Sequence, residues 1–158
     1  MPGGPSPQQQ GKLYKRLAAA AARAADEKKG DDIALLHTRP VSALADYTLI
    51  VSVTSANHLE AVEESVRKTL KDEGMLAQHR DGRRSGIWRV LDYGGLLVHL
   101  MHPSARELYA LDKVFHKAKK VRWNHKTGKA RVGKPRKAAG RTQARKAGGK
   151  TRPRKKRA

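Results

Sequence analysis

The chain has 158 residues, a formal net charge of +21 at pH 7 and no cysteine. This length supports one modest domain, and the lack of cysteine excludes disulfides and cysteine-based metal or nucleophile sites. The charge is unevenly placed, because residues 1–116 hold 16 Lys and Arg against 14 Asp and Glu, whereas residues 117–158 hold 19 cations and no acid. A nearly neutral body therefore precedes a polycationic tail.

The first predicted helix follows a short leader. Residues 1–11 are rich in Pro, Gly and Gln and have no apolar pattern, so we expect a disordered end. From Lys12, apolar residues at Leu13, Leu17, Ala20 and Ala24 recur at helical spacing, and Gly30 can cap the end. The pattern predicts an amphipathic helix.

Two strands and a second helix are expected next. The apolar runs 33–36 and 47–53 flank a turn at Arg39-Pro40, and the nearly unbroken second run is typical of a central strand. A stripe of apolar residues then predicts a helix that ends at Gly74: Leu59, Val62, Val66 and Leu70. We expect its other face to be solvated, with Glu63, Glu64, Arg67 and Lys71. Residues 75–80 suit a short edge strand.

Residues 86–101 predict a tight β-hairpin. Two apolar runs meet at Gly94-Gly95, and both glycines can adopt the positive φ that a two-residue turn demands. This turn pairs Trp88 with Met101 and Val90 with His99. Both faces of the hairpin are largely apolar, so we expect both to be covered.

A last helix begins at Pro103, where proline and the pattern Ser104-x-x-Glu107 are helix-start signals. The order of elements predicts an α/β domain with a mixed β-sheet and flanking helices. After Phe115 the apolar pattern stops, and the composition from Lys126 onward is that of a disordered segment. We expect three parts: a leader (1–11), one domain (12–116) and a disordered polycationic tail (117–158).

Several motifs resemble those of the ribosomal silencing factor (Iojap-like) family. The hairpin holds G-x-W-x-x-x-D-Y-G followed by Val98-His99, and further matches follow the family's order in the segments 45–50, 54–58 and 106–112. Gly95 departs from the pattern, because the family usually has an acid there. The resemblance also favours a domain helix over an organelle transit peptide for the first 25 residues, which lack acids and are rich in alanine.

The resemblance implies a nucleotidyltransferase-like α/β fold and a cytoplasmic translational repressor. Such a protein binds the large ribosomal subunit through that subunit's fourteenth protein and blocks joining of the small subunit. The competing hypothesis is a protein that binds or compacts nucleic acid through its cationic tail. Homodimerisation stays open.

Catalysis is not expected, although the implied fold is shared with nucleotidyltransferases. That chemistry holds its metal ions with carboxylates typically spaced acid-x-acid, and no such triplet occurs in the sequence. His99 and His102 are three apart but lack a third ligand nearby, so they indicate a metal site only weakly. We therefore expect no enzyme activity, no cofactor and no metal.

The hairpin supplies the candidate partner-binding residues: Trp88, Asp92, Tyr93, Gly94 and His99. Trp88 and Tyr93 have two interpretations, since aromatic residues in strands are often core residues but are also favoured binding anchors. His99 and Asp92 share a face and can form a functional polar pair. Alternatively, His99 is a structural histidine that fixes the hairpin register, and we favour this second interpretation.

For the tail, contact with ribosomal RNA is favoured over a merely solubilising role, because 19 cations without acids attract phosphate. Arg122-Trp123 adds one candidate base-stacking platform. The candidate RNA-binding residues are Arg122, Trp123, Arg136, Lys137, Arg141, Arg145, Lys146, Arg154, Lys155, Lys156 and Arg157.

Overall fold

The computed structural model describes residues 3–124. Its elements in chain order are helix α1 (Pro7–Glu27), strands β1 (Asp31–His37) and β2 (Tyr47–Ser52), helix α2 (Ala56–Asp72), strands β3 (His79–Asp81), β4 (Trp88–Asp92) and β5 (Leu96–Met101), helices α3 (Pro103–Tyr109) and α4 (Leu111–Val114), and strand β6 (Lys119–Lys120). The predicted order of elements is confirmed, with α4 and β6 as additions.

The six strands form one mixed sheet in the order β3-β4-β5-β2-β1-β6. β2 and β5 are parallel, and all the other neighbours are antiparallel. All six residues of β2 are buried, which confirms the central position that its unbroken apolar run predicts. The predicted edge strand is β3, which starts at His79.

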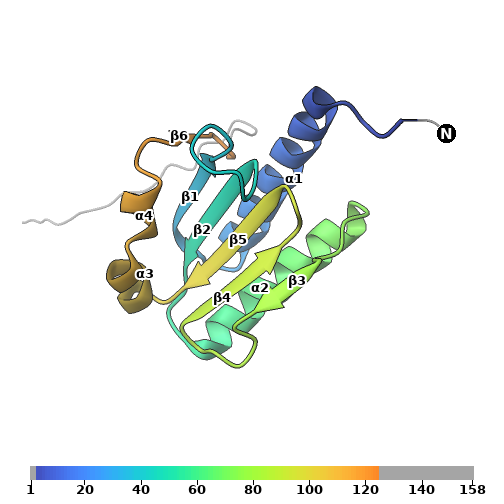
Figure 1. The fold of residues 1–158 in the computed structure, drawn as a ribbon. Helices are drawn as coiled ribbons and strands as arrows, with labels where there is room; N and C mark the ends of the chain where they lie inside the picture. Colours follow the sequence, from blue (N-terminus) through green and yellow to red (C-terminus); the bar gives the residue numbers. More distant parts are fainter. Residues whose placement is uncertain (1–2, 125–158) are drawn as a thin grey trace, which may run out of the picture. The chain divides into compact units, whose positions relative to one another are not determined.

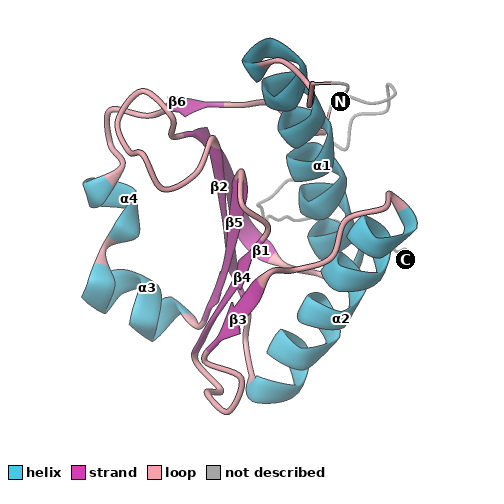
Figure 2. Ribbon diagram, turned by 45° about the vertical axis from the view of Figure 1, so that its right-hand side comes forward, coloured by secondary structure: helices cyan, strands magenta, loops and turns pink. Residues whose placement is uncertain are grey.

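Helices cover the two faces of the sheet unequally. α1 and α2 lie side by side on one face, and the short helices α3 and α4 lie on the other (Figures 1 and 2). The larger core therefore lies beneath α1 and α2, while a smaller cluster beneath α3 and α4 contains Leu36, Ile50, Met101 and Ala105.

α1 begins within the leader that we expected to be disordered. Ser6 is its N-cap, Pro7 follows, and the Ser6 and Gln9 side chains form a reciprocal capping box. Farther along, Leu17 and the alanines from Ala18 to Ala25 are buried, and all of them except Ala19 belong to the main core. Because alanine is small and the best helix former, this segment can pack closely against the sheet.

The described fold also continues beyond residue 116, where we expected the domain to end. β6 pairs with β1, and the amide of Val121 donates to the carbonyl of Leu35 at 2.8 Å. Trp123 packs against the main core, and its carbonyl accepts a hydrogen bond from Arg23 at 3.3 Å. The first residues of the predicted tail therefore belong to the folded domain.

The hairpin has the predicted register, with Trp88 opposite Met101 and Val90 opposite His99. Gly94 has φ +87°, whereas the φ of Gly95 is not positive, so only the first glycine uses its special freedom. A type II′ hairpin turn likewise needs a positive φ only at its first central residue. Gly95 is required for a different reason, which is its close approach to α1.

Glu63 does not lie on the solvated face of α2 where we expected it. Its side chain is 3% exposed, and its carboxylate accepts hydrogen bonds from Arg89 at 2.6 Å and from Arg80 at 2.8 Å. Burial raises the pKa of Glu63, but the two arginines outweigh this effect and hold that pKa below its usual range. The cluster ties α2 to β3 and β4.

Of the helices in the described part of the chain, none combines the length and the apolar character that crossing a membrane requires.

Candidate docking surface

The sheet face opposite α1 and α2 is only partly covered. Alternation along the hairpin strands places Trp88, Val90 and Asp92 of β4 and Leu97 and His99 of β5 on this face. Next to them Met101 is buried in the small cluster beneath α3 and α4, whereas Val90 and Leu97 are only half-buried. We expected both hairpin faces to be covered. The face toward α2 is covered, whereas the opposite face is covered only in part.

Trp88 and His99 are joined across the two strands. The indole Nε1–H of Trp88 donates to Nδ1 of His99 at 3.2 Å, and the two ring centroids lie 6.0 Å apart. Burial lowers the pKa of His99 to about 4, so the imidazole is neutral near pH 7 and its Nδ1 is free to accept. These contacts support the structural role for His99, which holds the Trp88 ring in place.

Asp92 does not pair with His99. Its Oδ1 accepts the backbone N–H of Gly94 at 2.8 Å, and its Oδ2 lies 3.5 Å from Nδ1 of His79. The carboxylate therefore stabilises the Gly94 turn and faces the edge strand β3. Asp92 and Gly94 are both half-buried, so they lie at the rim of the uncovered face.

Tyr93 is not part of this surface. Its side chain points to the other side of the sheet and is 1% exposed, within the core beneath α1 and α2. Burial raises the pKa of Tyr93 to about 12. The sequence motif places Tyr93 beside Asp92, but strand alternation sends the two side chains to opposite faces, so Tyr93 cannot contact a partner on this face.

Helix α3 adds an aromatic residue that sequence reasoning did not select. The ring centroid of Tyr109 lies 4.4 Å from that of Trp88, with 41° between the planes. Tyr109 is 49% exposed and its neighbour Leu108 is 75% exposed. We call Trp88, Leu108 and Tyr109 the aromatic patch. In the sequence, the one signal for Tyr109 is its place in the segment 106–112, which resembles the family.

A buried arginine fixes α3 in this position. Arg106 donates to the carboxylate of Asp112 at 3.0 and 3.1 Å, to Oγ of Ser52 at 2.9 Å and to the carbonyl of Asp32 at 2.6 Å. The hydrogen bonds from Arg106 hold the pKa of Asp112 below its usual range. α3 begins at Pro103 as the sequence predicts, and its N-cap is His102, whose side chain accepts the amide of Ser104.

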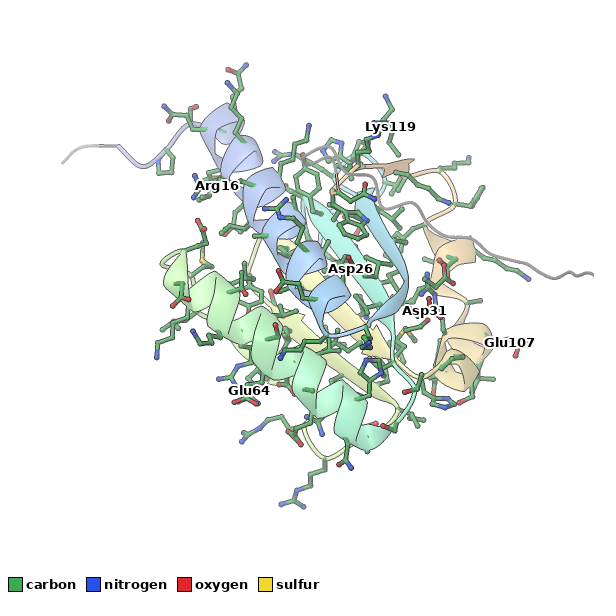
Figure 3. The ribbon with its side chains drawn as sticks, turned by 180° about the vertical axis from the view of Figure 1, so that it is seen from behind. Arg16, Asp26, Asp31, Glu64, Glu107 and Lys119 are labelled. Carbon is green, nitrogen blue, oxygen red and sulfur yellow. The ribbon has the colours of Figure 1, made fainter. Side chains whose placement is uncertain are left out.

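Two of the candidate RNA-binding residues lie within the described residues. Arg122 is exposed, but Trp123 is half-buried against the core and is a poor platform for base stacking. The other nine lie outside the described residues: Arg136, Lys137, Arg141, Arg145, Lys146, Arg154, Lys155, Lys156 and Arg157. Before them, Lys117, Lys119 and Lys120 are exposed, and Figure 3 shows Lys119 projecting from the β6 segment.

Within residues 3–124, the His, Asp and Glu side chains form no group of three that could hold a metal ion. His99 uses its Nδ1 for Trp88, and His102 uses its Nδ1 for the α3 cap. The chemistry that this face offers is therefore contact through aromatic and aliphatic side chains with a polar rim.

Comparisons with known proteins match this chain to one family. A family model described as ribosomal silencing factor during starvation matches residues 12–153. The ribosomal silencing factor of Halalkalibacterium halodurans is 27% identical over 107 residues, which cover 68% of this chain and 92% of that protein. That of Bacillus subtilis is 29% identical over 101 residues, covering 64% of this chain and 86% of the relative.

A solved structure shares the fold. The crystal structure of a protein from Chromobacterium violaceum superposes with a TM-score of 0.62 at 27% identity, and the match covers 65% of this chain and 85% of the other. The family model spans most of the sequence, from Lys12 in α1 through all the later helices and strands of the described residues. The chain therefore belongs to the ribosomal silencing factor family.

Proposed function

We propose that this protein is a cytoplasmic translational repressor that binds the large ribosomal subunit and prevents the small subunit from joining. Membership in the silencing factor family supports a ribosome-associated role in regulating translation. We further propose that this protein binds the fourteenth protein of the large subunit and that the aromatic patch makes the contact.

The observation that carries this proposal is the contact between half-buried Trp88 and exposed Tyr109. Aromatic residues are enriched at protein interfaces, and residues that dominate binding energy cluster in well-packed patches surrounded by polar groups. Here Tyr109 and Leu108 are exposed, while the hydrogen bond to His99 restrains Trp88. A restrained side chain loses less conformational entropy on binding, which favours affinity.

The mechanism follows from occupancy and needs no reaction. A folded domain that occupies part of the surface where the two subunits meet blocks joining sterically. Within residues 3–124 no group of His, Asp and Glu side chains could hold a metal ion, and on the uncovered face His99 is engaged by Trp88 and Asp92 by the backbone of Gly94. We therefore propose a binding protein without enzyme activity.

The cationic tail adds a second element to this proposal. Nineteen Lys and Arg without an acid follow residue 116, and a polycation next to a folded dock raises affinity for a phosphate-rich partner by linkage. The tail contacts ribosomal RNA near the dock, and this contact depends on salt.

Single substitutions test the dock. Leu108→Ser and Tyr109→Ser should each weaken binding to purified large subunits, measured by co-sedimentation, by about 10-fold or more. Leu44→Ser is the matched control, because Leu44 is also 75% exposed but lies in the loop between β1 and β2. Equal binding by the Leu108 and Leu44 variants would remove the aromatic patch from the proposal.

Truncation tests the tail separately. A chain ending at Asn124 keeps β6 and the packed Trp123, so the loss is confined to the cations beyond them. Its affinity should fall less steeply with salt than that of the full chain, because fewer counterions are released. An unchanged slope would exclude the tail from the interface.

The competing function is binding or compaction of nucleic acid through the tail, and the charge beyond residue 116 is what favours it. A sucrose gradient of a cell lysate separates the two proposals. Migration with free large subunits supports the silencing role, and migration with chromosomal DNA or free RNA supports the other.

A further inference from the structure

A second surface lies on the opposite side of the sheet from the aromatic patch. A cavity of about 430 Å³ opens between the second half of α2 and the segment that leads into β3. Its lining residues are Glu64, Arg67, Lys68, Lys71, Leu76, Ala77, Arg80 and Tyr93. This volume lies within the range of small-molecule sites in proteins.

The lining is strongly cationic. Four of the eight lining residues are Lys or Arg, against one carboxylate, Glu64. Arg80 is paired with the buried Glu63 and Lys68 with Asp72. Arg67 and Lys71 have no carboxylate oxygen within 4.0 Å among the described residues, so their charges remain available for an anion.

The inner wall carries an unused polar group. The Tyr93 hydroxyl is the one buried side-chain N or O atom in the described part of the chain that lacks a hydrogen-bond partner. Tyr93 lines the cavity together with Arg67 and Arg80. Because buried polar groups normally find partners, an orphan at the wall of a cationic cavity indicates a missing one.

Apolar groups complete the cavity. Leu76 is 66% exposed at its rim although it is a large aliphatic residue, and Ala77 beside it is half-buried. Ligand sites typically combine such apolar surface with a few convergent polar groups. The cations, the hydroxyl and the apolar rim together suit a ligand that has an anionic group, a hydrogen-bond acceptor and an apolar body.

We propose that this cavity binds a small phosphorylated molecule with an apolar or aromatic body. Arg67 and Lys71 neutralise its phosphate, the Tyr93 hydroxyl donates a hydrogen bond to one of its oxygens, and its body packs on Leu76. The site is separate from the aromatic patch, since the two lie on opposite faces of the sheet. Its occupancy is independent of the proposed docking function.

Isothermal titration of the full chain with ADP and with pyrophosphate tests this proposal. ADP should bind with one-to-one stoichiometry and more tightly than pyrophosphate, because only ADP supplies a body for Leu76. Arg67→Gln and Lys71→Gln should each weaken ADP binding by about 10-fold, as expected for a charge-assisted hydrogen bond. Tyr93→Phe should weaken it by about 3- to 10-fold, the effect of one neutral hydrogen bond.

Arg84→Gln is the matched control, since Arg84 is an exposed arginine in the loop between β3 and β4 and does not line the cavity. It should leave ADP binding unchanged. Equal weakening by Arg84→Gln and Arg67→Gln would overturn the proposal, because non-specific charge would then explain the binding. Absence of ADP binding, or binding only of a short RNA oligomer, would overturn it as well. A urea titration of Tyr93→Phe with an undiminished midpoint excludes misfolding as the cause.

Discussion

The ring of Tyr14 in α1 fills the space that a side chain at Gly95 would need. A Cβ added at Gly95 would collide with three atoms of that ring. The Tyr14 hydroxyl also donates to the carbonyl of Tyr93 at 3.1 Å. These contacts hold the first helix against the hairpin turn. The family usually has an acid at position 95, but in this chain Tyr14 leaves no room there for a side chain.

Gly95→Ala should therefore lower the free energy of unfolding by about 1–3 kcal/mol, the usual cost of overpacking. Urea denaturation measures this change. In a Tyr14→Ala background the same substitution should cost much less, because the colliding ring is gone. Gly11→Ala is the control, because Gly11 lies in α1 with Tyr14 and a Cβ there meets nothing within 4 Å. This substitution should stabilise the protein by about 0.5–1 kcal/mol. An equal cost of Gly95→Ala in both backgrounds would contradict the contact.

The buried imidazole of His99 should make stability depend on pH. Its pKa is lowered from 6.5 to about 4 in the folded state, so the unfolded chain binds more protons between these values. The stabilisation from neutral His99 is complete above pH 6.5 and is lost as the pH falls toward 4, by up to about 3 kcal/mol. His99→Gln should flatten this part of the curve of unfolding free energy against pH. Parallel curves for the two proteins would show that His99 titrates normally.

The ion cluster beneath α2 should be sensitive to loss of its carboxylate. Glu63→Gln leaves the buried Arg89 without its closest counter-charge, and breaking a buried pair in this way costs about 3 kcal/mol. The neighbouring Glu64→Gln is the control, because Glu64 is an exposed residue of the same helix (Figure 3). It should change the unfolding free energy by less than about 0.5 kcal/mol. Similar effects of the two substitutions in urea denaturation would refute the buried cluster.

Removing the Tyr93 hydroxyl should not destabilise the protein in the absence of a ligand. Tyr93→Phe deletes a buried group that has no partner, so the unfolding free energy should stay constant or rise by about 1 kcal/mol. Tyr14→Phe provides the contrast, because it deletes a hydroxyl that is hydrogen-bonded, and it should cost about 0.5–1.5 kcal/mol. A loss of stability in Tyr93→Phe as large as that in Tyr14→Phe would mean that the Tyr93 hydroxyl has a partner in the unliganded protein.

Local pattern was sufficient for much of the fold. The periodicity of apolar residues predicts α1, α2 and β2, and the Gly94-Gly95 pair predicts the hairpin together with its register. These features depend on residues close together in the chain, where helical spacing, strand alternation and turn chemistry act directly. The ends of the domain were predicted less well, because Ser6 caps α1 and Trp123 packs on the core through contacts that the local composition does not reveal.

The sequence by itself determined the order of the elements, the pairing of the hairpin and the separation of a neutral body from a cationic tail. The tertiary structure decided which of these residues meet the solvent. Tyr93 and Glu63 are buried because α1 and α2 cover their side of the sheet, while Tyr109 is exposed beside Trp88 because Arg106 fixes α3 on the other. Such outcomes depend on contacts between residues far apart in the chain, and periodicity assigns a residue to a face without saying what covers that face.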